Sequence, residues 1–234
     1  MFVVINKKVI AWVLVCVLLA GLGLAVGLTV PKRASAEERV IVLDPGHGGY
    51  DAGCKGLKLG VKESHVNLSI ALYAQAYLTD WGYKVVLTRT KDAALVSPTA
   101  SYKRQDMDKR LQLIADENAA IVVSIHCNSY PSALRRGTQV FWYKDKDETL
   151  AGALQSRLND TLNLPKGLRP YQALWGDYYL ARYSPCPTAI VECGLLSNPE
   201  DEALLASEEY RMTVGYQIAW GIREYLEAQG SLAQ

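Results

Sequence analysis

The sequence lacks an excess of charge of either sign, and it is poor in cysteine and histidine. Its 234 residues include 25 Lys and Arg against 24 Asp and Glu, five cysteines and three histidines. So little net charge gives no electrostatic reason to expect a nucleic-acid-binding protein. With 50% hydrophobic and 21% charged residues, the chain is neither intrinsically disordered nor a collagen-like repeat. The length and composition also exclude a disulfide-dense miniprotein. The cysteines form no Cys-x-x-Cys pair, so no disulfide framework is assigned.

The N-terminus carries an apolar run that predicts export. Residues 9–30 contain no charged side chain, and a helix of that length would rise roughly 33 Å, enough to cross a bilayer core of about 30 Å. Residues 1–8, with Lys7 and Lys8, would then lie in the cytoplasm. The alternative is a signal peptide cleaved near Ala36, because residues 34–36 have the small-x-small form of a cleavage site. Either way we expect an extracytoplasmic body, anchored or released.

The rest of the chain alternates short apolar runs with amphipathic stretches. After a linker at 31–38, we expect one domain at 39–227 and a tail at 228–234. Strands are predicted at 40–43, 83–88, 120–125, 137–143 and 188–191, and helices at 63–81, 107–114, 150–162 and 210–226. This alternation predicts an α/β fold, a mostly parallel twisted sheet covered by helices on both faces. The stretches 89–106 and 163–187 are predicted to be irregular.

Four chemically active side chains fall at or near strand ends. His47 follows the first strand within a glycine-rich turn, and His126 closes a central strand. Glu63 begins the first helix, and Glu192 ends the last strand. Parallel strands bring their carboxyl ends to one edge of the sheet, so we expect these groups to meet there.

Two imidazoles and a carboxylate can hold a zinc ion and leave one position open, which assigns His47, Glu63 and His126 as metal ligands. Glu192 is then the candidate acid–base group. Asp44 is predicted to orient the second ring nitrogen of His47. His65 lies two residues after Glu63 on the helix and is expected to face away from the site. Taken singly, each of these residues is more often structural than catalytic, and their gathering on separate loops favours a site.

Four segments carry a family resemblance. They are Val42 to Gly49 (VLDPGHGG), Glu63 with Asn67 and Leu68, Ser124 to Asn128 (SIHCN), and Val191 to Asn198 (VECGLLSN). In order and spacing they resemble the signatures of the zinc-dependent N-acetylmuramoyl-L-alanine amidases of the Amidase_3 type, over roughly residues 39–227. The resemblance implies hydrolysis of the amide between N-acetylmuramic acid and L-alanine in peptidoglycan. It also implies Zn²⁺ held by the residues matching His47, Glu63 and His126, with Glu192 as the catalytic carboxylate.

Within the family, the chain looks most similar to the membrane-anchored sporulation amidases needed for muramic-δ-lactam in spore cortex. That similarity rests on the N-terminal segment and on the lack of a separate wall-binding module. It also rests on the sequence SYKR at 101–104, which precedes DKRL at 108–111. It implies a functional partnership with a muramic acid deacetylase and a role in germination.

Three positions depart from the family pattern. Cys127 and Cys193 follow His126 and Glu192 directly, and alternation along a strand predicts that both face away from the metal. Gln172 stands where a lysine is expected after Arg169. Substrate contacts are therefore not assigned, and Asn128 and Arg169 are the candidates.

Two other functions stay open at this point. A zinc peptidase cutting within the stem peptide would use the same ligand types, and a membrane-tethered wall-binding protein would need no turnover. Mass spectrometry of digested peptidoglycan separates the three, because an amidase releases peptides that begin with L-alanine.

Overall fold

The computed structural model describes residues 39–144 and 146–232. The expected N-terminal segments at 1–8, 9–30 and 31–38, the cleavage site near Ala36 and Cys16 lie outside these residues, as do the last two residues of the expected tail. Within the described part of the chain, no helix combines the length and the apolar character needed to cross a membrane.

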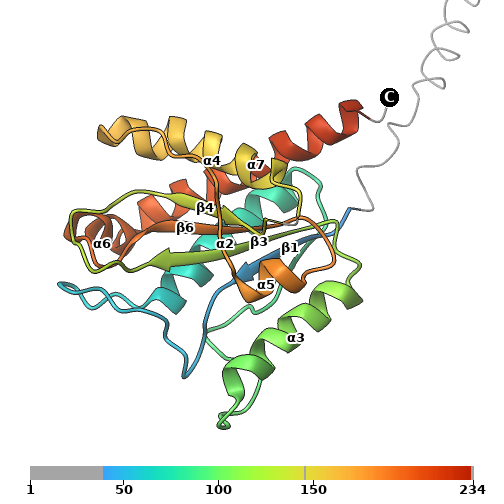
Figure 1. Ribbon diagram of the computed structural model, residues 1–234, viewed down its shortest axis with the longest axis horizontal. Coiled ribbons are helices and arrows are strands. Elements are labelled where there is room, and N and C mark those ends of the chain that lie inside the picture. Colours follow the sequence, from blue (N-terminus) through green and yellow to red (C-terminus); the bar gives the residue numbers. More distant parts are fainter. Residues whose placement is uncertain (1–38, 145, 233–234) are drawn as a thin grey trace, which may run out of the picture. The chain divides into compact units, whose positions relative to one another are not determined.

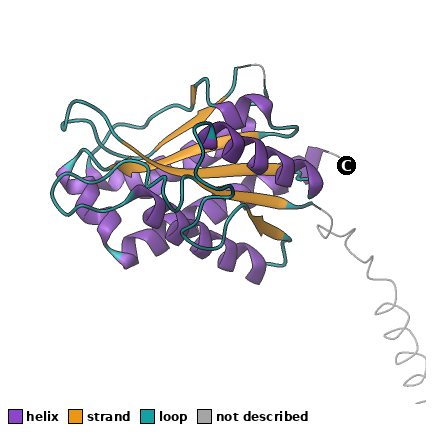
Figure 2. Ribbon diagram, turned by 90° about the horizontal axis from the view of Figure 1, so that it is seen from below, coloured by secondary structure: helices purple, strands orange, loops and turns teal. Residues whose placement is uncertain are grey.

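A six-stranded sheet in the order β2-β1-β3-β6-β4-β5 runs through the domain, and Figure 2 shows its strands side by side. The strands are β1 (Ile41–Pro45), β2 (Val85–Leu87), β3 (Ile121–Asn128), β4 (Gln139–Trp142), β5 (Leu174–Trp175) and β6 (Thr188–Leu195). β1 pairs in parallel with β2 and β3, and β3 pairs in parallel with β6. β4 runs antiparallel to β6, and β5 pairs in parallel with β4 at the edge of the sheet.

The sheet is therefore mostly parallel, as expected, but it is mixed because β4 is antiparallel to β6. The direction of β4 has a local cause. Residues 129–138 join β3 to β4 without a helix, and a parallel return needs a crossover of about a dozen or more residues, usually a helix.

Helices cover both faces of the sheet. They are α2 (Glu63–Asp80), α3 (Tyr102–Asp116), α4 (Thr149–Leu158), α5 (Tyr179–Tyr183), α6 (Pro199–Ala206) and α7 (Glu208–Leu232). In Figure 1, α3 and α5 lie on one side of the strands, and α4 and α7 lie on the other. The alternation along β1 explains the two layers: Ile41 and Leu43 belong to the larger core cluster with α2, α4 and α7, whereas Val40 and Val42 belong to a smaller one with Ile114 of α3.

The helical segments differ from expectation at their edges. α4 and the π-helical turn Asn159–Asn163 together cover the helix expected at 150–162, whereas α7 extends to Leu232, five residues beyond the expected domain end at 227. The stretch 163–187, expected to be irregular, contains β5 and α5, and α3 already begins at Tyr102. Very short elements leave too few residues to show a periodic pattern, so sequence periodicity cannot detect them.

Helical spacing predicts a stripe of Val66, Ile70, Tyr73, Tyr77 and Trp81 here, and the structure buries its two aliphatic members fully but its aromatic members only partly. The other core positions of α2 are Ala71, Ala74 and Leu78. Tyr77 of α2 and Trp81, which follows the helix, pack edge-on against aromatic rings of α7. A Cβ on Gly215 of α7 would lie 2.9 Å from the carbonyl oxygen of Ile70. The two helix backbones therefore approach closely through small residues, and the larger rings lie at the rim of the contact.

A buried ion pair joins α3 to β1. Arg110 is completely buried, and its Nη1 and Nε lie 2.5 Å from Asp44 Oδ1 and 2.7 Å from Asp106 Oδ2. The hydroxyls of Ser124 and Thr88 also donate to Asp44. Burial alone would raise the pKa of Asp44, but the charge of Arg110 and the two hydroxyl donors lower it to about 2.

Replacing Arg110 by methionine should destabilise the fold by about 3–5 kcal/mol, because two buried carboxylates would lose their counter-charge. Urea denaturation of the purified variant measures this loss. Arg104→Met on the same helix is the matched control, since Arg104 pairs with Asp108 at the exposed surface and such pairs contribute within about 1 kcal/mol. Equal losses in the two variants would contradict a structural role for the buried pair.

Candidate metal centre

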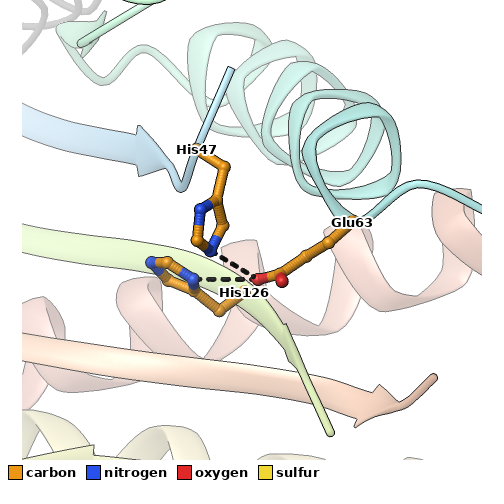
Figure 3. Close-up of side chains that lie close together, drawn as sticks. All are labelled: His47, Glu63 and His126. Atoms are coloured by element: carbon orange, nitrogen blue, oxygen red, sulfur yellow. Dashed lines mark hydrogen bonds and ion pairs between the residues drawn. The ribbon is translucent and has the colours of Figure 1, made fainter. Parts of the chain in front are cut away.

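Three side chains from separate segments converge at the carboxyl edge of the sheet (Figure 3). Glu63 Oε1 lies 3.2 Å from His47 Nε2 and 3.0 Å from His126 Nδ1. One potential ligand atom from each of the three residues lies within 4.8 Å of the others. The expected gathering of these groups is therefore present in the structure.

The strand register places the two histidines. β1 and β3 are paired up to Pro45 opposite Ile125, so the turn after β1 lies beside His126. The Gly46 N–H donates to the carbonyl of Ile125 at 2.9 Å, which holds the turn against β3. His47 then adopts a positive φ of 61°, a conformation that is uncommon for a residue with a Cβ. This turn aims the imidazole at the first residue of α2.

Glu63 is fixed by several donors besides the histidines. The backbone N–H of Cys54 donates to Oε2 at 2.8 Å, and the N–H of Cys127 donates to Oε1 at 3.2 Å. Asn67, one helical turn further along α2, donates from Nδ2 to Oε1 at 3.3 Å. These contacts hold the carboxylate in one orientation between the imidazoles.

The partner of the second His47 nitrogen is Asp51, not Asp44. His47 Nδ1 lies 3.0 Å from Asp51 Oδ2, in a tight loop closed by paired bonds between Gly48 and Asp51. The expectation for Asp44 is wrong because that carboxylate lies within the sheet and is occupied by Arg110 and two hydroxyls. Asp51 follows His47 by four residues in a glycine-rich loop, a spacing that could have suggested it.

The contact between Glu63 and His47 shifts the pKa values of both groups. Burial raises the pKa of Glu63, but hydrogen bonds and charge from the two histidines lower it far below its usual range. Burial lowers the pKa of His47, while Glu63 and then Asp51 raise it to about 9. These shifts favour an ionised Glu63 beside a protonated His47, and a metal ion bound at the His47 nitrogen would take the place of that proton.

Glu192 lies on the neighbouring strand, opposite His126 in the β3–β6 register. It is only 6% exposed, and its Oε2 has no hydrogen-bond partner among residues 39–144 and 146–232. Burial is the main cause that raises its pKa to about 7; the charge of His126 opposes this rise, and that of Glu63 adds to it. A carboxyl group with such a pKa can take up and release a proton near neutral pH.

The side chains of the remaining sequence candidates are not among the three that converge. The ring of His65 faces Asp92 at 2.8 Å on the exposed surface, as expected for a residue outside the site. Cys127 and Cys193 are buried in the larger core cluster, as alternation along their strands predicts. Asn128 ends β3, and Arg169 is exposed on the segment before β5.

Comparison with known proteins places the chain in a family. Residues 41–224 match the family described as N-acetylmuramoyl-L-alanine amidase. The chain belongs to this amidase family. The germination-specific N-acetylmuramoyl-L-alanine amidase of Bacillus subtilis is 35% identical over 198 residues, which cover 82% of this chain and 81% of that protein.

Solved amidase structures share the fold. The CwlD amidase from Clostridioides difficile, solved in complex with the GerS lipoprotein, superposes with a TM-score of 0.76 and 30% identity, over 81% of this chain and 99% of that one. The amidase AmiC2 of Nostoc punctiforme gives a TM-score of 0.72 and 30% identity, over 82% and 99%. The chain is thus an N-acetylmuramoyl-L-alanine amidase that acts on peptidoglycan, which favours amidase activity over the two alternatives left open by the sequence.

Proposed function

We propose that this amidase holds a zinc ion through His47, Glu63 and His126 and uses Glu192 as its catalytic acid–base. The bond cleaved is the amide between the lactyl group of N-acetylmuramic acid and L-alanine of the stem peptide. One observation carries the proposal: three ligand atoms converge within 4.8 Å, and an unpartnered buried carboxylate oxygen lies on the adjacent strand.

The donor set fits zinc better than a hard cation. Two imidazole nitrogens and one carboxylate oxygen are the ligand types of catalytic zinc sites that leave a position open, whereas Mg²⁺ and Ca²⁺ take mainly oxygen ligands. Asp51 on the far nitrogen of His47 supplies the carboxylate–histidine arrangement that fixes ring orientation in such sites. When bound, the ion would polarise the scissile carbonyl and make an attacking water more acidic.

Glu192 would accept and return the proton that the reaction transfers. Its buried Oε2 has no competing donor among the described residues, so it is available to accept a proton from the attacking water. The same oxygen then delivers that proton to the departing alanine nitrogen, which cannot leave as an anion. Burial raises the pKa of this carboxyl group toward neutral pH, which suits a residue that accepts a proton and later returns it.

Digestion of purified peptidoglycan tests the bond specificity. The protein should release stem peptides that begin with L-alanine and leave unsubstituted muramic acid, and chelation should abolish the release until zinc is restored. Mass spectrometry of the products reads out both ends of the cut. Fragments cleaved within the peptide, with the muramic acid–alanine bond intact, would identify a stem peptidase instead. Metal-loaded protein that bound the wall without cleaving it would indicate a wall-binding role.

The cellular role we propose is in spore cortex. It is supported by the similarity to a relative named germination-specific amidase. Removing stem peptides leaves muramic acid residues that a deacetylase could convert to the lactam, so a muramic acid deacetylase is the proposed functional partner. Preferential digestion of nascent cortex over vegetative wall supports this role, and equal digestion of both contradicts it.

The proposed site of action is outside the cytoplasm. Residues 9–30 would anchor the domain at 39–227 to the membrane, with residues 31–38 as a linker, or the segment would be removed near Ala36. The long apolar run supports anchoring, and the small residues before Ala36 support cleavage. The intact mass of the protein recovered from cells distinguishes the two forms.

A further inference from the structure

Arg89 is a buried arginine whose partners are backbone carbonyls. It lies two residues after β2 and is 4% exposed. Its Nε donates to the carbonyl of Pro45 at 2.9 Å, and Nη1 donates to that of Lys91 at 3.1 Å. Its Nη2 donates to Gly46 at 2.9 Å and to Ser64 at 2.8 Å. A planar guanidinium makes such a fork with fixed geometry, which a flexible ammonium cannot reproduce.

The two carbonyls that share Nη2 are neighbours of two proposed metal ligands. Gly46 precedes His47, and Ser64 follows Glu63. A single nitrogen therefore joins the turn after β1 to the first turn of α2. Asn67 reinforces this link, because its Nδ2 lies 3.2 Å from the Gly46 carbonyl and 3.3 Å from Glu63 Oε1.

The turn requires such support because His47 has a positive φ. Strained backbone of this kind persists only where the surroundings hold it. Arg110 donates to the carbonyls of Pro45 and His47 at 3.0 and 2.9 Å, and Arg89 holds those of Pro45 and Gly46. Of these two arginines, Arg89 alone also contacts α2 next to Glu63 through Ser64.

We propose that Arg89 is a positioning residue of the metal centre, which sets the distance between His47 and Glu63 by joining their backbones. The inference rests on the proposed zinc site and adds a residue that touches neither metal nor substrate. Its loss should therefore weaken zinc binding more than it weakens the fold.

The test compares Arg89→Met with Arg211→Met in the full-length protein. Arg211 is a matched control because it also joins α2 to backbone carbonyls, through Ser69, Leu205 and Ala206, but away from the histidines. Zinc affinity is measured by competition with a chromophoric chelator, and thermal unfolding is measured without metal. We expect Arg89→Met to weaken zinc binding by about 10–100-fold, the usual effect of losing an outer partner of a ligand. Arg211→Met should retain wild-type zinc affinity.

A conservative variant separates positioning from general stability. Arg89→Lys keeps a buried cation with donors but loses the fork, so its zinc affinity should lie between those of wild type and Arg89→Met. The absorption spectrum of the cobalt-substituted protein should shift in both Arg89 variants and not in Arg211→Met. If Arg89→Met does not fold, Arg89→Lys decides: wild-type affinity and spectrum overturn the inference, and a weakened site supports it.

The outcomes also separate this inference from the proposed function. Wild-type protein that binds no zinc overturns both. Wild-type protein that binds zinc, together with an Arg89→Met variant of equal affinity, overturns only the role of Arg89. Equal weakening of zinc binding in Arg89→Met and Arg211→Met shows a loss of general stability, and it also overturns the proposed role of Arg89.

Discussion

Replacing Glu192 by glutamine should lower turnover on peptidoglycan by about 10²–10⁴-fold, the usual contribution of a general acid–base, while zinc binding stays intact. Glutamine has the shape of glutamate but cannot accept the proton of the attacking water. The residue is almost fully buried, and no hydrogen bond to Oε2 would be lost within the described part of the chain. The substitution therefore removes the chemistry with little change in packing.

The readouts are release of N-terminal alanine from purified peptidoglycan and bound zinc measured by mass spectrometry of the purified protein. Glu148→Gln is the matched control, because Glu148 is exposed before α4 and makes no side-chain capping bond. It should retain wild-type turnover. A Glu192→Gln protein with near-wild-type turnover would remove Glu192 from the mechanism, and one that lost its zinc would identify Glu192 as a ligand.

The residues proposed for chemistry were predictable from sequence because their positions depend on local signals. His47 follows an apolar strand in a glycine-rich turn, and His126 and Glu192 end apolar runs. Once the strands are parallel, their ends meet without any further information about packing. Periodicity therefore predicted the longer strands and helices, whereas β5, α5, α6 and the antiparallel direction of β4 were not predicted.

The residues that hold the site were not predictable, because their partners are distant in sequence. Arg110 is 66 residues from Asp44, and Arg89 is 43 residues from Gly46. Charged side chains are expected at the surface unless they are paired, and nothing in the local pattern marks either arginine as buried. Helical spacing of Met107, Leu111 and Ile114 predicts a buried apolar stripe on α3, but of these the structure buries only Ile114. The other buried residues of α3 are Asp106 and Arg110. Only the tertiary arrangement shows that these charges meet.

Replacing Gly46 by alanine should disrupt the metal centre although it adds only a methyl group. A Cβ at this position would lie 2.1 Å from Cε1 and 2.3 Å from Nε2 of His126, far inside van der Waals contact. Either the turn or the ring must move. The turn is held on both sides, because the Gly46 N–H donates to Ile125 and its carbonyl accepts from Arg89. We therefore expect the imidazole of His126 to be displaced from Glu63.

Displacing one of three ligands should weaken zinc binding by more than the ~100-fold that the loss of an outer partner can produce, with a parallel fall in turnover. Gly152→Ala is the same chemical change in the middle of α4, where a Cβ meets nothing within 4 Å. It should leave zinc affinity unchanged and stabilise the helix by up to about 1 kcal/mol. Chelator competition and thermal unfolding compare the two variants directly. If Gly46→Ala bound zinc as tightly as Gly152→Ala, the ring of His126 would not be a ligand, since the added methyl group and a ring held by the metal cannot occupy the same space.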